Sequence, residues 1–424
     1  MTSSSNKARK TLQILNTNRT TDLIEKLKST EINNFAETIF RTDSKCTKIK
    51  TETRITSLEK ATNTEIPFLS NKVQFNNFDI LPGNIENYIG MTQIPTGIIG
   101  PIKVKGIDAY GDFYAPLATT EGALIASYNR GARAAYLSGG ITSVCLTEGV
   151  QRSPVFTFES IGDLASFLMW ALEQDEKFKE ITTQNSRFAK LSETKVNIEG
   201  NNLILVFEFY TGDAAGQNMV TICTDAICSY IIENCPIKPE YWFLEGNYSG
   251  DKKATALSFT NVRGKKVVAE VIIPQNIVVD ILKTTPELIV KYWQTSTIGV
   301  IQSGAIGAQG HFANGLAALF LATGQDVACV TEAAIGITRM EHHKNGGIYV
   351  SVTLPNLIVG TVGGGTILPT QQECLNIMDC NGAGKARKFA EICAAVVLSG
   401  EISIAAAISA GQFSHAHKKL GRKK

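Results

Sequence analysis

The sequence predicts a multidomain protein of the α+β or α/β class: a large domain around a buried central helix, an inserted ferredoxin-like α+β domain, and a small helical N-terminal region. The stretch at 116–133, PLATTEGALIASYNRGAR, spaces its apolar residues as a helix does, and alanine and glycine cover its other faces. Residues 153–243 follow a strand–helix–strand–strand–helix order, typical of a small α+β sandwich. With 424 residues, the chain is long enough for two or three domains and a sizeable core.

These observations divide the chain into four parts. Residues 1–85 form the N-terminal region, partly disordered and then helical. The large domain is discontinuous and takes in 86–152 and 256–424. Residues 153–243 form the inserted domain, and 244–255 form a loop that links the two.

Each part follows from its local pattern. Residues 1–18 are rich in Ser, Thr, Asn and Lys, as disordered segments are, and 21–63 hold two short amphipathic helical patterns. In 86–106, Gly and Pro punctuate short β-rich runs, which predicts turns and strands. The pattern further predicts a strand in 139–160, a helix at 161–181, strand–turn–strand at 186–214, a helix at 218–234, two strands around an Arg–Gly turn at 254–274, helices at 304–323 and 387–411, and a strand at 348–353.

The composition is that of an ordinary globular protein. Apolar residues make up 44% and charged residues 19%, and the formal net charge of +2 gives no case for a nucleic-acid partner. None of the nine cysteines forms a CxxC pair, and Cys223, Cys228 and Cys235 lack the spacing of a zinc site. None of the five histidines forms HExxH. We expect reduced thiols, a cytosol-like compartment and no metal.

No segment predicts membrane insertion. The first ten residues are polar and no apolar stretch follows them, unlike a signal peptide. The most apolar segments, around 298–307 and 392–410, are interrupted by Gly, Ser, Gln302 or Glu401 and fall short of the uninterrupted length that a membrane helix needs. We expect a soluble, cytoplasmic protein without a membrane anchor.

The carboxylate of Glu121 is the first candidate for chemistry. Thr119 and Thr120 are good N-cap residues, so Glu121 falls in the first turn, where the helix dipole favours a carboxylate. Taken alone, Glu121 is best interpreted as a capping residue. It becomes a catalytic candidate only if the fold supplies a lysine and a second carboxylate.

Three further stretches carry candidate groups. TGDAAGQNM (211–219) is an acidic, Gly-rich turn that leads into a helix. The N-terminal amides of such a helix can bind a phosphate or a nicotinamide amide. Taken alone, the segment is better interpreted as an ordinary capped turn. EGNYSGDKK (245–253) places two lysines before apolar strands, and a lysine drawn inward there would need a carboxylate partner. ANGLAALFLATGQD (313–326) ends in Asp326, whose charge opposes the helix dipole and predicts burial against a partner such as a lysine.

Two glycine-rich stretches look like dinucleotide fingerprints but lack the required spacing. Neither GTVGGGT (360–366) nor GAIGAQG (304–310) has the strand–GxGxxG–helix pattern with a following acid, so both are better interpreted as close-packing turns. By itself, His415 in SHAHKK is more typical of a surface tail than of a catalyst.

In this order, the motifs resemble the 3-hydroxy-3-methylglutaryl-coenzyme A (HMG-CoA) reductase family, in the class that includes the eukaryotic and archaeal enzymes. The matching stretches run from about 86 to 415: ENYIG, PTGIIGP, PLATTEGALIASYNRGAR, SRFAKL, TGDAAGQNM, GNYSGDKK, VRGKKVVAEVIIP, ATGQD, TLPNLIVGTVGGGTILPTQQECL, LSGEISIAAAISAGQF and SH. So many matches in one order are highly specific, and they cover nearly the whole chain expected to fold.

The resemblance implies a two-step hydride reduction by NADPH that takes the thioester to mevalonate and free coenzyme A. It implies that Lys252 polarises the carbonyl oxygen, Glu121 donates protons and Asp326 holds both in one network. His415 would protonate the departing thiolate. These residue types suit the chemistry, because a developing oxyanion needs a fixed cation and then a proton, and the thiolate needs its own acid.

The resemblance also assigns ligand contacts and assembly. The large domain would bind the substrate and coenzyme A, the inserted domain NADPH, and 244–255 would be the catalytic loop; ENYIG resembles a dimer-contact segment, which implies a homodimer or tetramer with active sites between subunits. Cofactor contacts would come from Ser186, Arg187, Phe188, Asp213, Ala214, Ala215, Gly216, Gln217 and Asn218, with Ser186 and Arg187 near the 2′-phosphate. Substrate and coenzyme A contacts would come from Ser127, Asn129, Arg130, Arg133, Arg152, Asp251, Lys253, Lys283, Asn314 and Ser414.

The sequence departs from the family pattern mainly around the pocket for the substrate carboxylate. Glu245 stands where serine is usual, Ala254 replaces a proline, and a lysine expected within 293–297 is missing. Ala215 and Gln217 replace two methionines of the cofactor motif, and no serine follows His415 as a phosphosite. Two alternatives remain open: a catalytically impaired acyl-CoA-binding relative, and an NADH-dependent degradative reductase of the same superfamily.

Overall fold

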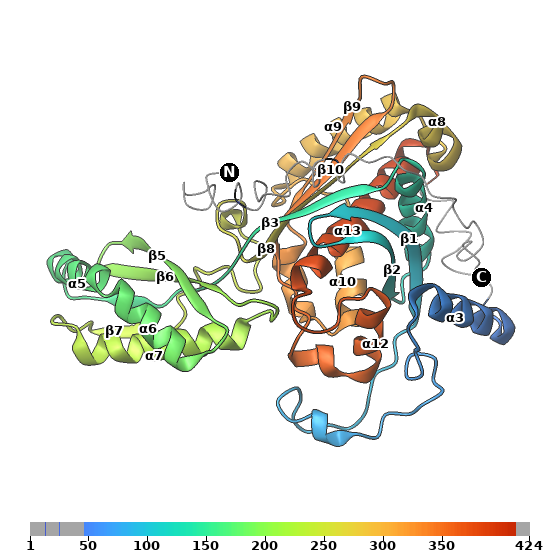
Figure 1. Cartoon of the computed structure of the whole chain (residues 1–424). Helices are drawn as coiled ribbons and strands as arrows, with labels where there is room; N and C mark the ends of the chain where they lie inside the picture. Colours follow the sequence, from blue (N-terminus) through green and yellow to red (C-terminus); the bar gives the residue numbers. More distant parts are fainter. Residues whose placement is uncertain (1–12, 14–24, 26–45, 413–424) are drawn as a thin grey trace.

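A single ten-stranded sheet runs through two lobes of the computed structural model, which describes Gln13, Glu25 and residues 46–412 (Figure 1). Its order is β7-β4-β6-β3-β8-β10-β9, with β1 against β3, β2 against β1 and β5 against β6. The strands are β1 (Thr96–Gly106), β2 (Tyr110–Ala118), β3 (Ile141–Arg152), β4 (Val155–Thr157), β5 (Lys190–Glu199), β6 (Asn202–Tyr210), β7 (Tyr241–Phe243), β8 (Gly264–Ile273), β9 (Ile337–His342) and β10 (Ile348–Leu357).

Strand β3 connects the two lobes. Its residues 142–149 pair antiparallel with β8 in the large lobe, whereas Val150 to Arg152 pair with β6 in the small lobe (Figure 1). A register shift between Cys145 and Thr147 marks a bulge, the usual way in which a long strand bends from one sheet into another. Arg152 therefore lies at the junction of the lobes.

The small lobe is the ferredoxin-like unit that the sequence predicts. Its elements run β4, α5 (Ile161–Glu173), α6 (Asp175–Asn185), β5, β6, α7 (Gln217–Asn234) and β7, and its strands lie in the order β7-β4-β6-β5. The three helices bury an apolar face against this sheet and share a core of their own. The helix expected at 161–181 is divided into two at Gln174.

In the large lobe, α13 (Ala386–Ser409) crosses the interior and α4 (Leu124–Leu137) packs against it (Figure 1). Around them lie α9 (Pro286–Ser303), α10 (Phe312–Thr323) and α12 (Pro369–Ile377), and α3 (Lys48–Thr62) lies at the periphery. Helices α4 and α13 approach closely at Gly131. A Cβ atom added to Gly131 would lie only 1.8 Å from the Ser399 carbonyl oxygen.

The central helix begins later than the sequence suggests. Residues 116–118 complete the pairing of β2 with β1, so the chain stays extended to Ala118, and α4 begins at Leu124 after Ala123 in a left-handed conformation (φ 73°). The Thr119 hydroxyl accepts from the Glu121 amide within the preceding turn. The predicted N-cap at Thr119 or Thr120, and the predicted place of Glu121 in the first helical turn, are therefore wrong.

Other elements also differ from the predictions. The two strands expected at 254–274 are a short 3₁₀ turn, Ala256–Phe259, followed by the single strand β8. The helix expected at 304–323 begins only at Phe312. Helix α9 and strand β9 were not predicted. Pairing with β10 decides the cases of β8 and β9, since short apolar runs do not distinguish strand from helix locally.

Helix α13 has the length and the apolar composition of a helix that could cross a membrane, but 83% of its most apolar 18-residue stretch is buried inside the protein. The expected interruption by Gly, Ser and Glu401 does not break it. Such burial is typical of the core helix of a folded domain. Within the described part of the chain, α13 is the one helix of this kind.

Two glutamates fix this buried helix through main-chain donors. The Glu391 carboxylate accepts from the amides of Asp108, Ala109 and Cys145, at 3.0, 2.7 and 3.1 Å. The Glu401 carboxylate, further along the same helix, accepts from the amides of Gly310 and His311. Both sets of contacts join α13 to loops and strands of the large lobe.

Glu391 should make the stability of the protein depend on pH. Burial raises its pKa from 4.5 to about 7, despite three amide donors. Its stabilising effect is therefore fully present below about pH 4.5 and is lost as the pH rises through 7, a change on the order of 3 kcal/mol. We expect Glu391→Gln to lose this decline between pH 4.5 and 7 in urea unfolding curves. Parallel pH profiles for the variant and wild type would contradict the expectation.

Candidate active site

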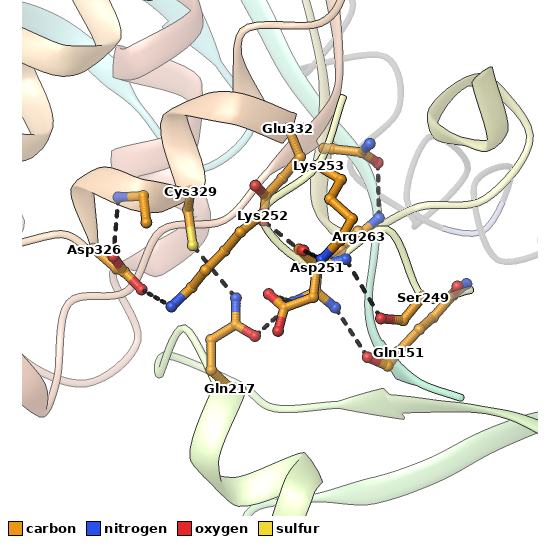
Figure 2. A network of polar contacts seen from close by, with 12 residues as sticks. Gln151, Gln217, Ser249, Asp251, Lys252, Lys253, Arg263, Asp326, Cys329 and Glu332 are labelled. Carbon is orange, nitrogen blue, oxygen red and sulfur yellow. Dashed lines mark hydrogen bonds and ion pairs between the residues drawn. The ribbon is translucent and has the colours of Figure 1, made fainter. Parts of the chain in front are cut away.

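Lys252 and Asp326 form an ion pair at the surface between the lobes. The Lys252 Nζ atom lies 3.0 Å from Asp326 Oδ2, and the two side chains are 46% and 43% exposed (Figure 2). Lys252 has a left-handed backbone conformation, φ 56°, in a turn that also contains Gly250 at φ 74°. The hydrogen bond to Asp326 raises the pKa of Lys252, which keeps the side chain cationic.

Asp326 is oriented by the start of the next helical turn. Helix α10 ends at Thr323 with Gly324 as its C-cap (φ 69°), so Asp326 lies two residues beyond the cap. Its Oδ1 atom accepts from the Ala328 amide at 3.0 Å, and its Oδ2 atom is directed to Lys252. The expected lysine partner is present, whereas the expected burial of Asp326 is not.

A buried network of charges lies beneath this pair. Asp251 binds Arg263 Nη2 through Oδ1 at 2.5 Å (Figure 2). Its Oδ2 atom binds Arg152 Nη1 at 3.2 Å. Burial alone would raise the pKa of Asp251, but the guanidinium groups of Arg263 and Arg152 outweigh it and hold the pKa below its ordinary value. The residue that precedes the catalytic lysine candidate is thus a fixed anion.

Arg263 and Glu332 are members of this network that were not among the predicted site residues. Arg263 is 3% exposed, donates to the Gln151 carbonyl at 2.9 Å, and directs Nε toward Glu332 Oε1 at 3.5 Å. Burial raises the pKa of Glu332. A single arginine between Val262 and Gly264, ahead of an apolar strand, was the available signal.

The loop that the sequence assigns to the cofactor reaches this network. Gln217, the first residue of α7, accepts from Arg263 Nη2 at 2.5 Å and donates to the Cys329 sulfur at 3.4 Å (Figure 2). Its neighbour Gly216 has φ 82°, and α7 has no side-chain cap, so its first amides face outward from the helix. Asp213 instead accepts from the Gly384 and Ala386 amides near the start of α13. Ala214 and Ala215 pack in the same loop against Gly360, and Asn218 follows in α7.

A second candidate cofactor segment lies at the end of α6. The Ser186 hydroxyl accepts from the amides of Phe188 and Ala189, at 3.2 and 3.0 Å, which closes a tight turn. Arg187 is exposed in this turn, and the Phe188 ring is 64% exposed. The turn therefore presents a cation and an aromatic face to the surface.

Glu121 lies at the head of α4 and is held by α10. Asn314 Nδ2 donates to Glu121 Oε2 at 2.8 Å. Among the described residues, no hydrogen bond or ion pair joins Glu121 to Lys252 or Asp326. The structure therefore brings two of the predicted catalytic residues together and places the third in a separate contact.

A buried histidine–glutamate pair lies at the start of α10, three residues before Asn314. His311 Nδ1 lies 3.1 Å from Glu401 Oε1, and the Tyr128 hydroxyl donates to the His311 carbonyl at 3.1 Å. Burial would raise the pKa of Glu401, but its contacts with His311 and Thr338 lower it. This pair fixes the loop that carries Asn314.

The residues assigned to coenzyme A are distributed differently. Ser127 and Arg130 bind Ser403 of α13, and Asn129 accepts from the Gly100 amide at 3.0 Å. Arg133 and Lys283 are exposed, and Lys283 has φ 60°. Lys253 donates to the Asp251 carbonyl at 2.9 Å. His415 and Ser414 lie outside the described residues.

The profile of the family described as hydroxymethylglutaryl-coenzyme A reductase matches residues 50–422 of this chain. The chain belongs to this family. A relative from Pyrococcus abyssi named 3-hydroxy-3-methylglutaryl-coenzyme A reductase is 43% identical over 409 residues, which cover 95% of this chain and 99% of the relative. One of the same name from Methanocaldococcus jannaschii is 42% identical over 382 residues, covering 88% and 93%. The family resemblance read from the motifs is thus confirmed.

Solved structures of the family share the fold. The class II 3-hydroxy-3-methylglutaryl-CoA reductase from Streptococcus pneumoniae, solved bound to NADPH in open conformations, matches with a TM-score of 0.65 over 80% of this chain and 91% of that one. Its sequence identity is 18%, so the similarity concerns the fold. It supports the predicted mixed α/β class.

Proposed function

We propose that this chain catalyses the NADPH-dependent reduction of HMG-CoA to mevalonate and coenzyme A. The observation that carries the proposal is the ion pair, at 3.0 Å, between Lys252 on the loop between the lobes and Asp326 after α10, in a member of this reductase family. A cation held in place by a carboxylate is suited to stabilise an oxyanion, because it needs no rearrangement when charge develops.

Each residue then has a defined task. Lys252 binds the carbonyl oxygen and stabilises its negative charge, while Asp326 keeps the lysine protonated and oriented. Glu121, oriented by Asn314, supplies the proton to the reduced oxygen. His415 gives a proton to the thiolate of coenzyme A, which otherwise would return to the aldehyde.

The described residues fit NADPH, whose chemistry is to supply the hydride in both steps. The uncapped N-terminus of the 18-residue helix α7 offers main-chain donors to a phosphate or an amide. Arg187 lies exposed in its turn, where a guanidinium can pair with a 2′-phosphate. Comparing NADPH with NADH as reductant tests this assignment against an NADH-dependent degradative enzyme.

We also propose a cytoplasmic homo-oligomer whose ligands are HMG-CoA and NADPH, without a nucleic-acid or membrane partner. The segment before β1 supports self-association, because it exposes apolar side chains: Ile89 is 100% exposed, Phe78 58% and Ile85 46%. Exposed apolar groups in one segment are typical of an interface. Sedimentation of the purified chain measures the oligomeric state.

NADPH oxidation with the substrate thioester tests the function, and His415→Gln tests the mechanism. Free mevaldehyde has no thiolate to release, so we expect the variant to lose most thioester reduction and to retain mevaldehyde reduction. Equal losses with both substrates would show that His415 is not the acid for the thiolate. Wild type that oxidises NADPH with neither substrate would support the alternative of an impaired acyl-CoA-binding relative.

A further inference from the structure

Arg152 is a buried cation whose hydrogen-bonding capacity is only partly used. Its side chain is 9% exposed, and a single nitrogen, Nη1, binds both Glu245 Oε2 at 3.0 Å and Asp251 Oδ2 at 3.2 Å. Nη2 reaches the Gln217 carbonyl only at 3.5 Å, and Nε is buried without an acceptor among the described residues. A guanidinium can bind a carboxylate through two parallel hydrogen bonds, and here it does not.

Glu245 occupies Arg152 through one oxygen and leaves the other unpaired. Its Oε2 atom also accepts from the Ser249 hydroxyl at 3.0 Å. Its Oε1 atom is buried and receives no hydrogen bond within the described part of the chain. The next residue, Gly246, donates to the Ser153 carbonyl at 2.7 Å, which keeps the loop beside Arg152. The Arg152–Glu245 contact is thus close, but each side chain keeps one buried polar atom without a hydrogen bond among the described residues.

Of the two carboxylates on Arg152, Glu245 is the one that can be displaced. Asp251 is also bound by Arg263 Nη2 at 2.5 Å, and Arg263 is 3% exposed, so moving Asp251 would take the nearer of two carboxylates from a second buried cation and leave it Glu332 at 3.5 Å. Glu245 has Arg152 as its only ion-pair partner among the described residues. It belongs to the loop 244–255, which also carries Lys252.

We propose that Glu245 determines substrate specificity by competing with the carboxylate of the acyl group for Arg152. This inference rests on the proposed function, in which an acidic acyl thioester binds beside Lys252. An acyl group that ends in a carboxylate must displace Glu245 or bind against its charge, whereas a neutral acyl group meets no such penalty. The residue therefore weakens binding of acidic acyl groups relative to neutral ones.

The test compares Glu245→Gln and Glu245→Ser with wild type. Gln retains the size of the side chain and removes its charge, and Ser removes both. We expect the Michaelis constant for HMG-CoA to fall at least about tenfold, with the change concentrated in this constant rather than in kcat. The dissociation constant of free 3-hydroxy-3-methylglutarate, measured by calorimetry, should fall by a similar factor. Its dimethyl ester, which carries no carboxylate, should bind all three proteins alike.

Glu341→Gln is the matched control, because it removes one carboxylate, paired with Arg339, from the strand β9 and changes the net charge equally. It should leave all these constants unchanged. Unchanged or weaker binding of the diacid in both Glu245 variants would overturn the inference, as would an equal gain for the dimethyl ester.

The calorimetric readout separates this inference from the proposed function. If wild type reduces no HMG-CoA but Glu245→Gln binds the diacid more tightly, the function is refuted for this substrate and the specificity role stands. If neither protein binds the diacid, the inference fails too. Thermal unfolding of each variant verifies that it is folded before binding is compared.

Discussion

Lys252→Met should lower turnover by roughly a hundredfold or more with both HMG-CoA and mevaldehyde, since both reductions develop negative charge on a carbonyl oxygen. Methionine keeps most of the length of the side chain and removes the cation. The side chain is 46% exposed and its ion-pair partner is 43% exposed, so the fold should tolerate the change. The measurement is steady-state NADPH oxidation, with thermal unfolding as the check on folding. Turnover near that of wild type in a folded variant would refute the assignment of Lys252.

Asp326→Asn provides a second measurement of the same pair. The Asp326 carboxylate raises the pKa of Lys252 above its ordinary value of 10.5. Without this carboxylate the lysine loses its proton at lower pH, so the alkaline limb of the activity profile should move downward. An unchanged alkaline limb would show that another group controls it.

The sequence predicts the site best where a short motif determines the local backbone conformation. A Gly-rich turn that ends in two lysines predicted a lysine with a carboxylate partner, and Lys252 pairs with Asp326 as expected. The exposure of that pair was not anticipated, because the sequence does not show where two lobes leave an open surface. The partners of Arg263 were also missed, since Gln217 and Glu332 come from distant elements and only the fold brings them together.

The predicted start of the central helix is wrong because strand pairing competes there with local helix capping. Thr119, Thr120 and Glu121 form a good N-cap sequence, yet the ladder between β1 and β2 continues to Ala118 and the helix starts at Leu124. Helix α9, although not predicted, does carry a sequence signal. Thr285 caps it by accepting a hydrogen bond from the Leu288 amide, and Pro286 occupies the first turn.

Gly131→Ala should destabilise the large lobe by about 3 kcal/mol or more. The new Cβ atom would lie 1.8 Å from the Ser399 carbonyl oxygen and 2.6 Å from its carbon, and these atoms belong to the backbone of the buried helix α13. Relief therefore requires α4 and α13 to move apart, which opens the core that both helices share. Thermal unfolding and urea unfolding should both show the loss.

Gly299→Ala is the matched control for this packing effect. Gly299 also lies inside a helix, α9, but apart from its chain neighbours and the nearby backbone of α9, no atom of the described residues lies within 4 Å of the position that an alanine methyl would take there. Alanine has the higher helix propensity, by about 1 kcal/mol, so this variant should be neutral or slightly more stable. The same propensity gain applies at Gly131, and only the contact with Ser399 differs. Equal stability of the two variants would mean that α4 and α13 do not depend on a glycine for their close approach.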